Sequence, residues 1–177
     1  MKSSSTFILI SLFGFYACNG PKEKPSTSDD GINSILSSEN SGAIHGTEIG
    51  DEKEYVISRI KPHIVSEMPD EITARIPLSI KDSTFYDIDY DFKKEKLYSI
   101  DLDIYPNSKA DCDLLFGNFK EYYNSIYGKG QEKKGFMVWY TISKTGEDVE
   151  IMMMDESESH RKPYLAITFY QEENISK

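Results

Sequence analysis

The sequence predicts an α+β fold of two successive α-β-β-β units, whose strands form antiparallel sheet and whose helices cover one face. Apolar and polar residues alternate with period two in several segments, as in half-buried antiparallel strands. A helical segment precedes each group of three such strands, at about 49–106 and 107–171. This order suggests an internal duplication, although the two halves share little sequence identity and repeat only in pattern.

The first unit opens with the helical segment GDEKEYVISRIK, in which Asp51 is a possible N-cap and Pro62 ends the helix. Three alternating segments follow it. Pro77 has no N–H group, so we expect the first of these strands at a sheet edge or with that N–H side unpaired. The apolar residues that we expect on the covered face are Ile72, Ala74, Ile76, Leu78, Ile80, Tyr86, Ile88, Tyr90, Phe92, Tyr98, Ile100, Leu102 and Ile104.

The second unit opens with an amphipathic helix, for which Ser108 and Asp111 form a capping box and Gly128 lies at the C′ position. Three strands follow, in FMVWYTI, VEIMMM and YLAITFY. Their alternation predicts a covered set of Phe136, Val138, Tyr140, Ile142, Val149, Ile151, Met153, Leu165, Ile167 and Phe169. It predicts an opposite, open set of Met137, Trp139, Met152, Met154, Tyr164 and Tyr170.

This open set is unusually rich in interface-forming side chains. Trp and Tyr anchor many protein interfaces, and Met adapts to irregular contacts. We therefore expect a partner-binding surface there, unless the N-terminal tether, another segment or a second sheet covers it.

The hairpin of the first unit carries a ladder of aspartates on its polar side: Asp87, Asp89, Asp91, Asp101 and Asp103. Keeping the apolar residues on one face requires paired residue numbers with an even sum. If Phe92 faces Tyr98, then Asp89 lies opposite Asp101 and Asp87 opposite Asp103, and Arg75 would approach Asp91 in a matching meander. Facing like charges are destabilising, so another group must offset them. The ladder is interpreted as a solvated face, a surface for a basic partner or, alternatively, a calcium site.

The calcium alternative departs from the EF-hand pattern. DIDYDF offers the first three ligands of that loop, but Phe92 stands where glycine is required and Tyr98 where the bidentate glutamate belongs. The sequence also lacks HExxH, GxSxG and phosphate-loop motifs, and Cys112 reads as a buried, inert thiol. We therefore predict no enzyme activity, no cofactor and no dedicated metal site.

The net charge of the chain argues against one class of partner, the nucleic acids. The 177 residues include 20 basic and 30 acidic side chains, a net charge of −10. Because binding to phosphate backbones needs clustered Lys and Arg, we expect no nucleic-acid partner.

The first 17 residues have the layout of a secretory signal peptide, with Lys2 followed by a polar stretch and an apolar core over 7–16. As a helix, this core would span roughly 15 Å, half of a hydrocarbon layer. The following FYAC resembles the lipobox of bacterial lipoproteins, with departures at Phe15 and Tyr16, where that family prefers Leu and a small residue.

The lipobox resemblance implies cleavage before Cys18 and acylation of that residue with chains such as palmitate, which would anchor the protein in the bacterial envelope, as we expect in the outer membrane. The alternatives are an ordinary signal peptide with a chance cysteine, or an uncleaved anchor. Residues 18–48 are rich in Ser, Gly, Pro, Asn and Asp and are predicted to form the lipidated cysteine and a flexible tether before an α+β domain at 49–177.

In element order alone, residues 49–171 resemble the beta-lactamase-inhibitor-like group of folds, in which two helix-plus-sheet units share a concave sheet. That resemblance implies binding of a protein partner through the open sheet. It would place Trp139, Tyr164 and Tyr170 at the contact, with Asp89 and Asp101 as an acidic flank. The sequence thus predicts an envelope lipoprotein of inhibitor, assembly or immunity type; the alternative is a calcium- or small-ligand-binding domain that uses the aspartate hairpin.

Overall fold

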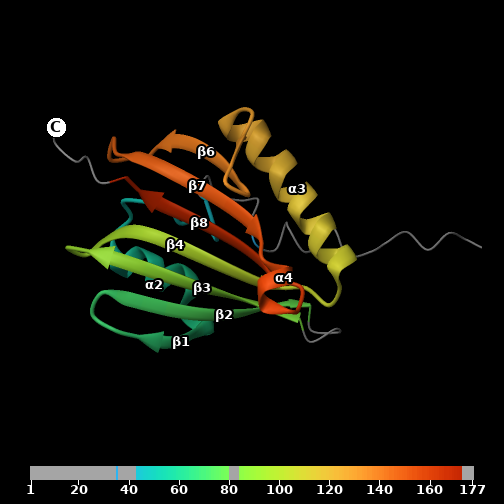
Figure 1. Ribbon diagram of the computed structural model, residues 1–177. Coiled ribbons are helices and arrows are strands. Elements are labelled where there is room, and N and C mark those ends of the chain that lie inside the picture. Colours follow the sequence, from blue (N-terminus) through green and yellow to red (C-terminus); the bar gives the residue numbers. More distant parts are fainter. Residues whose placement is uncertain (1–34, 36–42, 80–83, 173–177) are drawn as a thin grey trace, which may run out of the picture.

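The computed structural model describes Ile35 and residues 43–79 and 84–172. These residues form one open antiparallel sheet of eight strands, in the order β1-β2-β3-β4-β8-β7-β6-β5 (Figure 1). The predicted α+β class and the antiparallel sheet are confirmed. The strands are β1 (Ile64–Glu67), β2 (Glu71–Ser79), β3 (Thr84–Lys93), β4 (Lys96–Tyr105), β5 (Gln131–Lys133), β6 (Phe136–Ile142), β7 (Asp148–Asp155) and β8 (Leu165–Gln171).

The two outer strands, β1 and β5, were not predicted and are short. Because β1 is the edge, β2 lies one strand inside the sheet, and the prediction of an edge position for it is wrong. The ladder between β1 and β2 reaches only from Ile72 to Ala74, however, so Pro77 lies beyond it and pairs on its other side with Phe85. This agrees with the alternative that the N–H side of Pro77 is unpaired.

The helices are α2 (Lys53–Ile60), the 3-10 helix η1 (Lys61–His63), α3 (Lys109–Tyr127) and α4 (Ser157–His160). As predicted, Ser108 caps α3, by accepting a hydrogen bond from the Asp111 backbone N–H. Gly128 ends the helix with a φ of 82°, but at the C-cap position and not at the predicted C′ position. None of the helices in the described part of the chain is long and apolar enough to cross a membrane.

The predicted cap of α2 is wrong. Glu52 occupies the N-cap position and makes no side-chain cap bond. Asp51 is buried instead, where its carboxylate accepts hydrogen bonds from the Glu48 backbone N–H and the Lys144 ammonium group. This side chain therefore joins the start of the domain to the β6–β7 turn.

Helices α2 and α3 pack on the same face of the sheet, which we call the covered face. Figure 1 shows α2 behind β3 and β4, while Tyr123 of α3 packs edge-on against Trp139 of β6 and Phe169 of β8. The predicted apolar residues of β3, β4, β7 and β8 lie in this core, with one exception at a β-bulge. The bulge after Asp91 places Leu97 in the core, so the prediction for Tyr98 is wrong.

The folded region begins earlier than predicted. Ile44 and Thr47 are fully buried, and Ile35 belongs to the same core cluster, so the described part of the predicted tether packs against the domain. Burial of these apolar side chains offsets the entropy of ordering a polar segment. The signal peptide and Cys18 lie outside the described residues.

Candidate functional site: the open face of the sheet

The side chains of strand β6 lie on the opposite faces of the sheet from those predicted. Met137 and Trp139 point into the covered face, where Trp139 is only 2% exposed and its ring lies 5.4 Å from that of Tyr123. The indole N–H donates to Oδ1 of Asn124 on α3, 3.0 Å away. The prediction that Trp139 and Met137 lie on the open face, in a partner surface, is therefore wrong.

The cause of this error is the composition of FMVWYTI, which is apolar on both sides of the strand. Alternation then carries no information on which side faces the core, and a shift by one residue reverses every side chain. The long-range packing around Trp139 settles the orientation. A Cβ atom on Gly130 would lie 2.6 Å from the indole, so this glycine makes room for the ring.

The opposite side of β6 and its neighbour β7 form an apolar strip on the open face. Tyr140 and Ile142 are 42% and 67% exposed, whereas Val138, opposite Met152 in the ladder, is only 3% exposed. Met152 and Met154 lie on this face, as predicted. The apolar strip consists of Phe136, Val138, Tyr140, Ile142, Met152 and Met154.

Tyr164 and Tyr170 also lie on the open face, as predicted, but both are engaged in hydrogen bonds. The Tyr164 hydroxyl donates to Asp103, and the Tyr98 hydroxyl donates to that of Tyr170 at 2.8 Å. Tyr170 on β8, and Tyr164 just before that strand and only 8% exposed, thus link this part of the sheet to β4.

The aspartate ladder lies on β3 and β4 beside this strip, and the predicted pairs, Asp89 with Asp101 and Asp87 with Asp103, are confirmed. Hydrogen-bond donors from the flanking strands and from Tyr164 offset their charge. The Thr73 hydroxyl donates to Asp89 at 2.6 Å, and the Thr168 hydroxyl donates to Asp101 at the same distance.

Arg75 pairs with Asp87, not with Asp91 as predicted, because the two residues are directly opposite in the β2–β3 ladder. Its guanidinium donates two hydrogen bonds to the carboxylate, at 2.7 and 2.8 Å. This bidentate geometry fixes the side chain at one end of the ladder.

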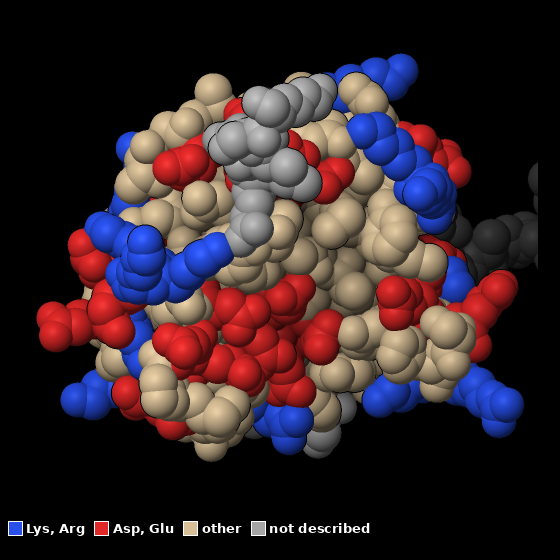
Figure 2. All heavy atoms as spheres, turned by 60° about the vertical axis from the view of Figure 1, so that its left-hand side comes forward, with Lys and Arg blue, Asp and Glu red and all other residues tan. Residues whose placement is uncertain are grey.

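The charges of the ladder are only partly offset. Burial, and then the neighbouring carboxylates Asp101, Glu71 and Asp89, raise the pKa of Asp91. Burial also raises the pKa of Asp103, against the opposing effect of the hydrogen bond from Tyr164. Figure 2 shows acidic side chains gathered in one patch, with Lys and Arg side chains around the margin of the molecule.

No three Asp, Glu, His or Cys side chains converge on one point among the residues that the structure describes. Asp87, Asp89, Asp101 and Asp103 each accept a hydrogen bond from a different side chain, rather than turning toward a common centre. The calcium hypothesis therefore rests on the sequence alone.

A further polar site, at His45, was not singled out by the sequence. Its Nε2 lies 2.7 Å from the hydroxyl of Tyr86, and the two rings stack with centroids 5.9 Å apart. Burial, followed by the charges of His63 and Arg59, lowers the pKa of His45 to about 4. Its place in a Ser- and Gly-rich stretch gave no signal, because the contact partner is 41 residues away.

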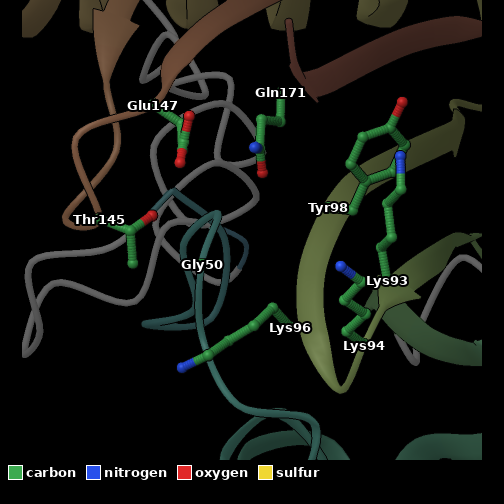
Figure 3. Close-up of a pocket in the computed structure, with 8 residues that line it drawn as sticks. All are labelled: Gly50, Lys93, Lys94, Lys96, Tyr98, Thr145, Glu147 and Gln171. Atoms are coloured by element: carbon green, nitrogen blue, oxygen red, sulfur yellow. The ribbon is translucent and has the colours of Figure 1, made fainter. Parts of the chain in front are cut away.

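A hollow of about 420 Å³ lies at one end of the sheet, beyond the tips of the β3–β4 and β6–β7 hairpins (Figure 3). Its walls come from segments far apart in the sequence, which is why no local motif predicted it. The lining residues are Gly50, Lys93, Lys94, Lys96, Tyr98, Thr145, Glu147 and Gln171.

Comparisons of the chain with known protein families, with curated proteins and with solved structures give no match. The arguments about function below therefore rest on the geometry and chemistry of this chain.

Proposed function

We propose that this protein is an envelope lipoprotein that binds a protein partner through the open face of its sheet, as an inhibitor, assembly factor or immunity protein does. The observation that carries the proposal is the combination on one face of an apolar strip and an aspartate ladder, with neither α2 nor α3 over them. Exposed apolar side chains beside fixed charges are typical of interfaces.

The partner, on this proposal, presents basic side chains to the aspartates and apolar ones to the strip. Charge complementarity supports a basic partner: burial is the main cause of the raised pKa values of Asp91 and Asp103, and the neighbouring carboxylates add repulsion that a cation would relieve. Trp139 has no part in this surface. In its place the proposal assigns the contact to Tyr140, Met152 and Met154, with Tyr164 and Tyr170 at the junction with the acids.

The proposal includes a duplicated origin for the sheet. Each run of four strands follows one helix, and the two runs meet where β4 pairs with β8. Two equivalent units joined in this way would produce a single wide face, as in the beta-lactamase-inhibitor-like folds. Support comes from the element order, since the sequences of the halves differ.

Membrane attachment through acylated Cys18 is part of the same proposal, and its support is the FYAC stretch after the apolar leader. Anchoring would hold the domain at the envelope and favour partners in that compartment. The test is the intact mass and detergent partitioning of protein from its native membrane. A Cys18→Ser variant should lack the acyl mass and leave the detergent phase, whereas an unchanged mass would contradict lipidation.

The partner surface is tested by photo-crosslinking from Tyr140 replaced by a photoreactive amino acid, followed by quantified capture with variants. We expect Met152→Asp to abolish crosslinking, because it places a charge in the apolar strip. Asp89→Lys with Asp101→Lys should reduce capture at least tenfold and remove its dependence on salt.

The matched control is Glu121→Lys on the exposed side of α3, which changes charge away from the sheet and should leave capture unchanged. Crosslinked product that persists in all the open-face variants, or that forms equally from a photoreactive residue at position 121, would contradict the assignment of the surface.

A further inference from the structure

The hollow beyond the hairpin tips has charges of opposite sign on different walls. In Figure 3, Lys93 and Lys94 lie on one side together with Tyr98, whereas Glu147 and the Gln171 amide enter from the other. Its volume of about 420 Å³ is within the range of small-molecule sites, which is roughly 300–1,000 Å³. The hollow lies at the end of the sheet and adjoins the open face at Tyr98, whose hydroxyl donates to Tyr170.

The side chains of this hollow are not equivalent. Lys96 is bound to the Glu52 carboxylate, and the Lys93 ammonium group lies 5.2 Å from the centroid of the Tyr98 ring. Lys94 and Glu147, in contrast, have no ion pair with any residue of the described ranges 43–79 and 84–172. Two opposite charges without an ion pair among the described residues therefore line one space.

The backbone maintains this arrangement. Lys94 and Glu95 form the tip of the β3–β4 hairpin with φ values of 54° and 61°. Gly50, with a φ of 93°, allows the β6–β7 turn to come close, since a Cβ there would lie 2.8 Å from the Thr145 hydroxyl.

We propose that this hollow binds a small zwitterion, whose phosphate lies against Lys94 and Lys93 and whose ammonium group pairs with Glu147. Charges on both walls favour a ligand with both signs over a simple anion, which Glu147 would repel. Lysine ammonium groups act as point charges suited to phosphate, and no arginine is among the described residues of the lining to make a bidentate carboxylate contact. Phosphoethanolamine is the smallest ligand with this chemistry.

Such a group could come from a soluble metabolite or from the headgroup of a lipid. The first experiment titrates the full chain carrying Cys18→Ser with phosphoethanolamine, ethyl phosphate and ethanolamine, and follows binding by calorimetry. Phosphoethanolamine should bind at least tenfold more tightly than either fragment. Flotation of the same protein with phosphatidylethanolamine vesicles, against phosphatidylcholine vesicles, then identifies the lipid source if only the former bind.

Two variants test the phosphate-binding side and the ammonium-binding side of the site independently. Lys94→Asn, which keeps a residue that tolerates positive φ, should weaken phosphoethanolamine at least tenfold. Glu147→Gln should remove the preference for phosphoethanolamine over ethyl phosphate. Lys120→Asn and Glu121→Gln on α3 are the matched controls, and unchanged thermal unfolding confirms that each variant is folded.

The proposal is overturned if wild-type protein binds ethyl phosphate as tightly as phosphoethanolamine, or if Lys94→Asn binds like wild type. Absence of binding to the soluble ligand up to about 10 mM, together with no flotation on either vesicle, overturns it as well.

Discussion

Neighbouring residues of the same strands lie on opposite faces of the sheet and differ in burial and in the contacts that they make. On β6, Trp139 is 2% exposed and packs against α3, whereas the next residue, Tyr140, is 42% exposed on the open face. The covered face carries fully buried side chains held by packing, and the open face carries an apolar strip and an aspartate ladder held by hydrogen bonds. Substitutions on the covered face should therefore reduce stability, and those on the open face should change binding.

The largest effect is expected at Trp139. Trp139→Ala removes a buried indole, leaves a cavity against Tyr123 and removes one of the two hydrogen bonds that Asn124 Oδ1 accepts, and should lower the free energy of unfolding by about 3–5 kcal/mol. The measurement is chemical denaturation at neutral pH.

Tyr140→Ala is the control on the opposite side of the strand, and it should lower the free energy of unfolding by less than about 1 kcal/mol. Equal losses for Trp139→Ala and Tyr140→Ala would contradict the orientation of β6 and, with it, the division of the sheet into two faces.

The second-largest effect is the pH dependence of the free energy of unfolding, which we expect from His45 on the covered face. Because the folded-state pKa of His45 is about 4, below the ordinary value of 6.5, the unfolded chain binds this proton more readily. The stabilisation is complete above pH 6.5 and is lost as pH falls towards 4, by up to roughly 3 kcal/mol.

The measurement for His45 is the free energy of unfolding across pH 4–7.5, for wild type and for His45→Asn, which suits the φ of 51° at that position. The difference between the two proteins should shrink as pH falls through this window. A difference independent of pH would show that burial does not hold His45 neutral in the folded protein.

A third prediction concerns the fit around the indole. Gly130→Ala would place a Cβ 2.6 Å from the Trp139 ring and should lower the free energy of unfolding by about 1–3 kcal/mol through overpacking. Combined with Trp139→Ala, the same substitution should cost much less, because the ring is then absent. Additive losses in this double-mutant cycle would contradict the close approach of Gly130 to Trp139.

How far the sequence predicts the fold depends on how polar the second face of each strand is. In β3 and β4, Asp residues alternate with Ile, Leu and Tyr, so the face and the register, Asp89 opposite Asp101, could be predicted. In β6 both faces are apolar, and only contacts with Asn124 and Gly130 on distant segments select the orientation. Local pattern carries no information on such contacts.

The same limit applies to the sites. The aspartate ladder was predictable, but its donors were not, because Thr168 and Tyr164 reach it from β8 and its approach, more than 60 residues away. The burial of His45 and the hollow beside Lys94 also depend on long-range packing. Pairing across the sheet, rather than composition, decides which charged side chains are left without partners.

The smallest effect tests the open face. Since burial and the neighbouring carboxylates raise the pKa of Asp91, the folded state loses stability as pH rises through that raised value, and at pH 7 the ionised group is unfavourable. Asp91→Asn should therefore raise the free energy of unfolding by about 0.5 kcal/mol at low salt, a modest amount because solvent screens a partly exposed group. High salt should reduce the gain, and Glu132→Gln on exposed β5 should show none. A loss of stability in Asp91→Asn would mean that the aspartates stabilise the fold, in which case their crowding would no longer argue for a basic partner.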